Sequence, residues 1–253
     1  MKHVRNNWKL GTILLVVLAI VIAGCQPIQP GAMQAGRQAG RQGGMGGRFA
    51  DVTNVDDQGA TAVDHTMLQT AIAAMPVTDL TAVEQAGLLY MREEEKLAHD
   101  VYVTLGEKWN VPVFQNIPQS EQTHMDAVKL LLGRYGLSDP ATDKAIGVFT
   151  DAPLQGLYND LVEQGSQSLA AALTVGATIE DLDIVDLQTR LAQTDKADIQ
   201  LVYENLLKGS RNHLRAFTRT LTRQAGASYT PQYLSQKAFT EIVNTPMERG
   251  ISR

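Results

Sequence analysis

Four long segments of this 253-residue chain carry apolar residues at the three- and four-residue spacing of amphipathic helices. No run alternates apolar and polar residues convincingly, so we expect an all-α folded part. The stretch Thr81-Ala82-Val83-Glu84 is a capping box, and Gly136 and Gly226 are typical helix stops. The expected helices cover about residues 66–75, 81–109, 116–135, 166–193 and 195–225, and Gly176 is a candidate bend in the fourth of these.

The lengths of the connections predict how these helices are arranged. Short connections join the first two long helices and the last two. Between these pairs lie about 30 residues, 137–165, which include a short helix beginning at Asp151. Two antiparallel hairpins joined by one long crossover form the ferritin-like type of four-helix bundle. We place this domain at residues 65–245, with a strap over 229–243 and a frayed tail at 246–253.

The N-terminus has the features of a bacterial lipoprotein leader. Lys2, Arg5 and Lys9 precede an apolar stretch over 10–23 that is short for a membrane span. The following Ile22-Ala23-Gly24-Cys25 resembles a lipobox, in which the cysteine is diacylated and becomes the new N-terminus. We therefore predict a signal peptide over 1–24 and a lipid anchor on Cys25. An ordinary signal peptide, or an uncleaved anchor with an incidental cysteine, is the alternative.

This leader also predicts where the protein resides. An extracytoplasmic, lipid-anchored location follows from the lipobox, and the membrane is then a binding partner. Gln26, rather than the aspartate that retains lipoproteins at the inner membrane, predicts the outer membrane in a cell that has one. Cys25 is the only cysteine, which excludes a disulfide and thiolate-rich metal sites.

Residues 25–64 are rich in Gly, Gln and Ala and show no sustained period. Such a segment buries too little apolar surface to offset its ordering entropy, so we expect a flexible tether. Removing the first 24 residues leaves 19 basic against 27 acidic residues, a net charge of −8. That charge argues against a nucleic-acid partner, which needs a basic face.

Acidic and histidine residues occupy helix positions where a bundle core needs apolar ones. They lie on the inward face of each long helix: Glu95, Glu121, His124, Glu180, Asp183 and His213, with Glu94 at the margin of the first stripe. Burying several unpaired carboxylates is costly, and a pair of divalent metals removes that cost. Oxygen and imidazole ligands suit iron or manganese. Taken singly, each residue could instead be a satisfied core histidine or part of a solvated charge run.

Four ordered motifs carry a resemblance to a known superfamily. They are MREEEKLAHDVY (91–102), SEQTHMDAV (120–128), IEDLDIVDL (179–187) and GSRNHLRAF (209–217). With the intervening helices, the sequence resembles the ferritin-like superfamily over about 80–243. Within it, the chain is similar to an uncharacterised prokaryotic family, domain of unknown function 2202.

The resemblance implies a ligand set and a chemistry. It favours Glu95 over Glu94, because a ligand glutamate there is followed seven residues later by an inward tyrosine, here Tyr102. The resemblance assigns the other metal ligands to Glu121, His124, Glu180 and His213. Ser210 stands where a second Glu-x-x-His motif would have its glutamate, and Asp183 could supply the missing carboxylate. Without it, the second metal would be weakly held or the site would be mononuclear.

Two iron ions are the implied cofactor, with manganese as the alternative metal. Oxidation of Fe(II) or reduction of O₂ or peroxide is the implied activity, of ferroxidase or peroxidase type, with Tyr102 beside the reacting centre. The sequence does not indicate the electron donor. A metal-binding lipoprotein without turnover, and a metal-free structural helical module, remain alternatives.

Overall fold

The computed structural model describes residues 51–249. This part of the chain is mainly helical and contains seven helices and one two-stranded sheet. None of the described helices is long and apolar enough to cross a membrane. The signal peptide, Cys25, most of the predicted tether and the last four residues lie outside the described range.

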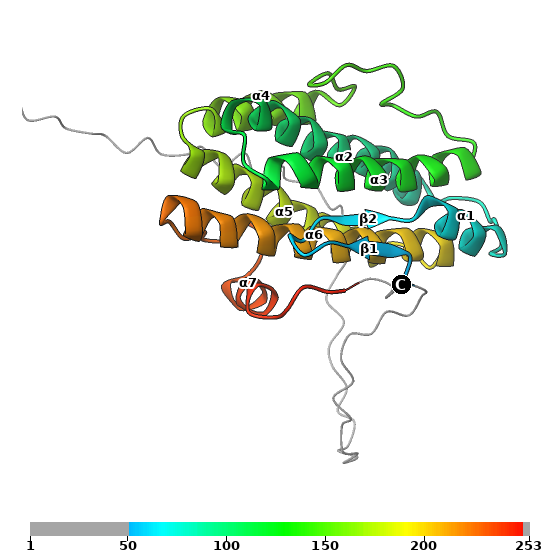
Figure 1. Ribbon diagram of the computed structural model, residues 1–253. Coiled ribbons are helices and arrows are strands. Elements are labelled where there is room, and N and C mark those ends of the chain that lie inside the picture. The colour runs from blue at the N-terminus through cyan, green and yellow to red at the C-terminus, as the bar shows by residue number, and fades with distance from the viewer. Residues whose placement is uncertain (1–50, 250–253) are drawn as a thin grey trace, which may run out of the picture. The chain divides into compact units, whose positions relative to one another are not determined.

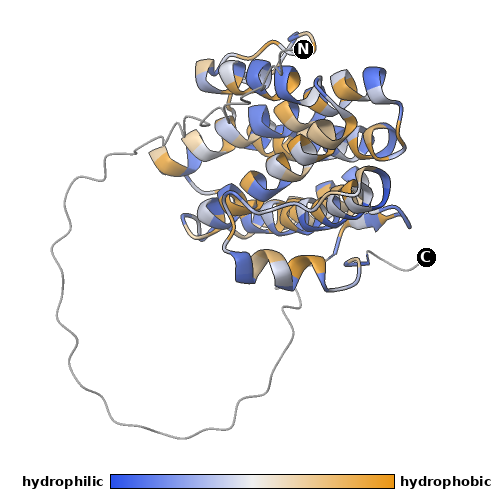
Figure 2. Cartoon of the chain, turned by 90° about the vertical axis from the view of Figure 1, so that its left-hand side faces the viewer, coloured by the Kyte–Doolittle hydropathy of each residue, from blue (hydrophilic) through white to orange (hydrophobic). Residues whose placement is uncertain are grey.

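Four long helices pack together and form the body of the described part. They are α2 (Ala82–Trp109), α3 (Val113–Arg134), α5 (Leu169–Leu191) and α6 (Ala197–Ala225). Helix α2 packs along α3 and α5 along α6, and further contacts join α2 to α5 and α3 to α6. In Figure 1 the α2–α3 pair lies above the α5–α6 pair. Apolar and polar residues share the surface of each helix in Figure 2, as amphipathic helices require.

The core between the helix pairs consists of fully buried aliphatic and aromatic side chains. Each such side chain contributes roughly 1.5–3 kcal/mol to the stability of the fold. Representative members from the four long helices are Leu88, Tyr102, Ile117, Leu131, Leu173, Leu187, Leu206 and Phe217.

Local capping signals predicted several helix ends correctly. The Thr81 side chain and Glu84 form the predicted capping box of α2. Asp151 caps α4 (Ala152–Gly165), and α6 ends before Gly226. Helix α5 continues through Gly176 without a break.

Two helix starts differ from the prediction. Helix α3 begins at Val113 rather than near Asn116 and contains Pro118, and its N-cap Pro112 makes no side-chain capping bond. Helix α6 begins at Ala197 rather than at residue 195, and its N-cap Lys196 also makes no side-chain capping bond. Neither Pro112 nor Lys196 has a side chain that caps a helix, so the usual capping signals do not mark these two starts.

The crossover between α3 and α5 is held on α2 by charged side chains. These belong to the motif 91–102 but point away from the helix seam. Their contacts are Arg92 Nε to Asp139 (3.0 Å), the Thr150 and Asp151 amides to Glu93 (2.5 and 2.9 Å), Lys96 Nζ to the Ala145 carbonyl (2.9 Å) and the Gly147 amide to Asp100 (2.8 Å). The charged stretch 92–100 thus serves two purposes, and only part of it faces the interior.

A β-hairpin forms where the sequence predicted the end of the flexible tether. Its strands are β1 (Thr53–Val55) and β2 (Thr61–Val63), paired antiparallel. Strand β2 packs against α3 and α6, beside which it runs in Figure 1. The Val63 amide donates to Thr123 Oγ1 at 2.8 Å. Within the predicted tether, residues 51–64 are therefore structured, and these long-range contacts hold them in place. Helix α1 (His65–Ala73) follows directly.

The C-terminal strap contains α7 (Gln236–Val243), which packs on α6. Asp181 of α5 anchors the strap by accepting hydrogen bonds from the Tyr229 hydroxyl and the Leu234 amide, both at 2.8 Å. Glu248 pairs with Arg211 at 2.5 Å and with Arg215 at 3.1 Å. The expectation of a frayed tail is thus wrong for residues 246–249.

Candidate metal centre

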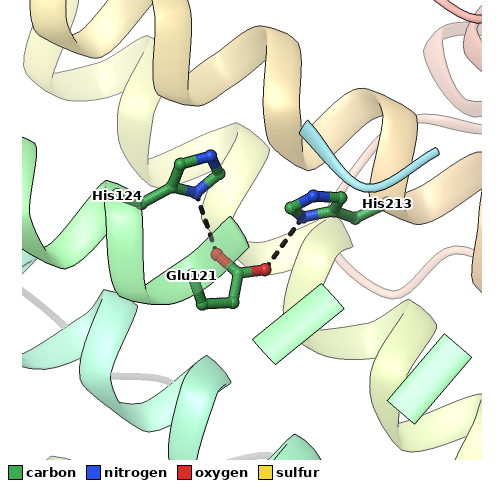
Figure 3. Close-up of side chains that lie close together, drawn as sticks. All are labelled: Glu121, His124 and His213. Atoms are coloured by element: carbon green, nitrogen blue, oxygen red, sulfur yellow. Dashed lines mark ion pairs between the residues drawn. The ribbon is translucent and has the colours of Figure 1, made fainter. Parts of the chain in front are cut away.

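Three buried side chains from α3 and α6 form the centre of the site. Glu121 and His124 lie one turn apart on α3, so their side chains share a face of that helix. His213 projects from α6. One ligand atom from each of the three residues lies within 4.8 Å of the others, a spacing that one metal ion could bridge. Figure 3 shows the Glu121 carboxylate between the two imidazole rings.

The Nδ1 atoms of both histidines face Glu121. His124 Nδ1 lies 2.9 Å from Glu121 Oε2, and His213 Nδ1 lies 2.8 Å from Glu121 Oε1. Although both distances are those of ion pairs, neither Nδ1 atom has a hydrogen-bond partner of good geometry. The rings stack, with centroids 5.4 Å apart and planes 22° apart. The two nitrogen lone pairs can therefore converge on a space beside one carboxylate.

Glu95 and Glu180 extend the cluster, one toward each histidine. Glu95 Oε2 on α2 is 3.3 Å from His124 Nδ1, and Glu180 Oε1 on α5 is 3.6 Å from His213 Nδ1. Tyr102 donates a hydrogen bond to Glu180 Oε1 at 2.6 Å. All four long helices therefore contribute an acidic or imidazole side chain at the same depth.

Asp183 lies one turn from Glu180 and contacts Ser210, the residue that stands where the resemblance would place a glutamate. Ser210 Oγ donates to Asp183 Oδ2, whereas Asp183 Oδ1 has no hydrogen-bond partner. No ion pair joins Asp183 to either histidine within residues 51–249. The structure thus brings Asp183 to the cluster but places it further from the imidazoles than Glu95 or Glu180.

Glu94 is buried as deeply as Glu95, with 3% against 2% of its surface exposed. The sequence placed it only at the margin of the inward stripe. Both Glu94 oxygens lack a hydrogen-bond partner, and neither pairs with a histidine. Burial and the nearby charges of Asp183 and Asp186 raise its pKa well above the usual range. Glu95, which lies 3.3 Å from His124 Nδ1, is therefore the better-placed ligand.

Two contacts of the histidines could not be foreseen from the helical pattern. The Thr61 carbonyl on β2 lies 2.9 Å from His124 Nε2, and the Thr61 amide donates to His213 Nε2 at 3.3 Å. Gly209 lets α6 approach His124 closely, because a Cβ there would lie 2.5 Å from the His124 ring. Thr61 lies in the segment expected to be disordered, so no motif could have identified it.

Electrostatics within the cluster favour bound protons. Burial and the charge of Glu121 raise the pKa of Glu180 to about 7. Although burial lowers the pKa of His213, Glu121 and Glu180 outweigh it and raise that pKa to about 9. Burial raises the pKa of Glu121, but His213 and His124 outweigh that effect and leave it well below its usual range. A divalent cation bound here would replace protons in balancing the carboxylate charge.

These residues fit a divalent metal ion. Glu95 Oε1, Asp183 Oδ1 and both Nδ1 atoms are buried without hydrogen-bond partners, which is costly for polar atoms unless another ligand satisfies them. Carboxylate oxygen with imidazole nitrogen is a donor set that iron, manganese and zinc all accept. The fold and the cluster therefore define a helical protein with a buried Glu–His–His site that could hold a metal ion.

The chain belongs to the family described as "Uncharacterized protein domain (DUF2202)", whose profile matches residues 84–246. It is 53% identical over 182 residues to uncharacterized protein MJ0754 of Methanocaldococcus jannaschii, covering 72% of this chain and 98% of the relative. The crystal structure titled hypothetical protein MJ0754 from Methanococcus jannaschii DSM 2661 superposes with a TM-score of 0.67 at 52% identity. That match covers 69% of this chain and 99% of the other.

Proposed function

We propose that this protein is a ferritin-like, di-metal carboxylate protein anchored outside the cytoplasmic membrane by a lipid on Cys25. The observation that carries the metal part is the buried Glu121 carboxylate set between two imidazole Nδ1 atoms. Two packed helix pairs joined by a crossover of the length seen here support the ferritin-like assignment. The lipobox-like Ile22-Ala23-Gly24-Cys25 supports the anchor.

Two metal positions share Glu121 in this proposal. Glu95 and His124 would hold one ion, and Glu180 and His213 would hold the other, with Asp183 as a further carboxylate. Iron is the proposed metal, and manganese is the alternative. Bound iron would supply one-electron exchange with O₂ or peroxide, so oxidation of Fe(II) or reduction of O₂ or peroxide is the proposed activity.

The surrounding residues have defined tasks. Tyr102 holds Glu180 Oε1 through its hydroxyl at 2.6 Å and so orients that carboxylate. The pKa of the Tyr102 hydroxyl is raised well above the usual range by burial and by the charges of Glu180 and Glu121, so it keeps its proton at neutral pH. The apolar residues around the cluster exclude water and strengthen every charge interaction within it.

A metal-binding lipoprotein without turnover is the second candidate. The observation that favours it is Ser210, which replaces a carboxylate and whose Oγ donates to Asp183 Oδ2. If the His213 position binds metal too weakly to function, the protein would hold a metal without reacting.

Oxygen consumption on addition of Fe(II) distinguishes the two candidates. The full chain, purified without chelator, should consume O₂ and develop ferric absorbance over several turnovers. Glu121→Gln should abolish that uptake, and Glu163→Gln, which alters an exposed carboxylate on α4, should not. Metal binding without oxygen uptake would instead establish the non-catalytic candidate.

A further inference from the structure

The backbone amide and the backbone carbonyl of Thr61 each contact one histidine of the centre. In the hairpin, the ladder bonds run from the Asp56 amide to the Ala60 carbonyl (3.0 Å) and from the Asp64 amide to the Val52 carbonyl (2.7 Å). The pair Val55–Thr61 is therefore a non-hydrogen-bonded pair of the antiparallel ladder. At such a pair, the amide and carbonyl point away from the partner strand, and at Thr61 they point at the imidazoles.

The two contacts require opposite proton positions on the two rings. A neutral imidazole has one nitrogen that donates and one that accepts. The Thr61 carbonyl can only accept, so His124 carries its proton on Nε2 and leaves the Nδ1 lone pair free for a metal. The Thr61 amide can only donate, so neutral His213 offers its lone pair at Nε2 and carries its proton on Nδ1.

The His213 half of the centre also has a serine where the resemblance would place a further glutamate. Ser210 lies one turn before His213 and has its Oγ directed to Asp183 Oδ2. A metal bound at His213 Nδ1 requires the remaining ring proton to lie on Nε2, where it opposes the Thr61 amide and leaves that buried donor unsatisfied. At His124, metal binding leaves the hydrogen bond to Thr61 intact. Two separate features therefore disfavour the His213 position.

We infer that the backbone amide and carbonyl of Thr61 make the two metal positions unequal in affinity, with the tight position at His124 and the weak position at His213. This inference rests on the proposed function, because it concerns the same centre. Thr61 acts here as a positioning residue through its backbone. Loss of an outer hydrogen bond at a metal ligand costs roughly 10- to 100-fold in affinity, so the two dissociation constants should differ by about that factor.

Zinc titration of the full chain against a coloured chelator tests this inference. The parent should show a tight and a weak class of zinc-binding site, or the tight class alone. His213→Ala should keep the tight class and His124→Ala should lose it. In the ¹⁵N spectrum of the parent with one equivalent of zinc, only His124 Nδ1 should show a metal-bound shift, and this measurement requires no variant.

A backbone change tests Thr61 directly. Replacing Thr61 by its α-hydroxy acid turns the amide into an ester, which removes the N–H and keeps the Thr61 carbonyl and side chain, so the weak position should tighten by roughly 10-fold. Thr61→Val, which keeps the backbone amide and carbonyl, is the matched control. It should leave the ratio of the two dissociation constants unchanged.

Equal affinities at the two positions, loss of the tight class in His213→Ala, or an ester without effect would overturn the inference while leaving the metal centre intact. Absence of zinc binding by the parent would overturn the proposed function itself.

Discussion

Gly209→Ala separates a metal-binding role of His124 from a structural one. A Cβ at residue 209 would lie 2.5 Å from His124 Cε1 and 2.6 Å from His124 Nε2. Restoring ordinary van der Waals contact requires the ring to move by about 1 Å. Metal–ligand distances tolerate only about 0.2 Å, so the His124 Nδ1 atom would leave its binding position. We expect metal affinity to fall roughly 10- to 100-fold, which corresponds to about 1.4–2.8 kcal/mol.

The effect on folding should be smaller than the clash alone suggests. Overpacking a core costs about 1–3 kcal/mol, and alanine is favoured over glycine within a helix by about 0.5–1 kcal/mol. Gly165→Ala is the matched control, because its Cβ would lie 2.6 Å from Leu105, a residue with no part in the cluster.

Thermal unfolding of the metal-free proteins measures the stability of the two variants, and chelator competition measures their metal affinity. The two measurements should rank the variants differently. Both variants should lose similar stability, and only Gly209→Ala should lose metal affinity. Parental affinity in Gly209→Ala, or an equal loss of affinity in Gly165→Ala, would refute the reasoning.

Three further predictions follow from the same geometry. The pKa of His213 is about 9 against an ordinary 6.5, and that of Glu180 is about 7 against an ordinary 4.5. Each group therefore stabilises the metal-free protein fully below its ordinary pKa. Each loses that contribution as the pH rises through its raised pKa, about 7 for Glu180 and about 9 for His213. Metal must displace the same protons, so affinity in a chelator competition should rise between pH 7 and 9, and a flat profile would contradict this. Glu95→Gln should lower metal affinity by roughly 10-fold or more, because Glu95 lies near His124. Glu94→Gln should leave the affinity nearly unchanged, because Glu94 pairs with neither histidine. Equal losses of affinity on calorimetric titration would refute the assignment of Glu95. Cys25→Ser should release the protein from membranes or leave an unprocessed precursor, and unchanged attachment after carbonate washing would argue against the lipid anchor.

Much of the helical body could be predicted because its signals are local. The Thr81 capping box and the Asp151 cap depend on residues within one turn, and the structure has both. The inward positions of Glu121, His124 and His213 follow from the three- and four-residue spacing of a helix face, which fixes direction before any packing is known. These spacings were sufficient to bring the three residues together.

The hairpin could not be predicted, because long-range contacts hold it. Its two strands have three residues each, too few for a visible alternation. The Val63 amide donates a hydrogen bond to Thr123, and the Val52 amide donates one to Asn205 at 3.2 Å.

The orientation of the charged residues 92–96 was ambiguous for a related reason. Periodicity alone could not show that Arg92 and Glu93 bind the crossover while Glu94 and Glu95 are buried among the helices.

Metal content of the full chain, purified without chelator and measured by elemental analysis, tests the central claim most directly. We predict between one and two transition-metal ions per chain as isolated and close to two after saturation. Glu121→Ala should lose this metal and, because both histidines lose their nearest carboxylate, change the stability of the metal-free protein. Absence of stoichiometric metal in the parent, together with a Glu121→Ala variant as stable as the parent, would show that the cluster is only a structural hydrogen-bonded network.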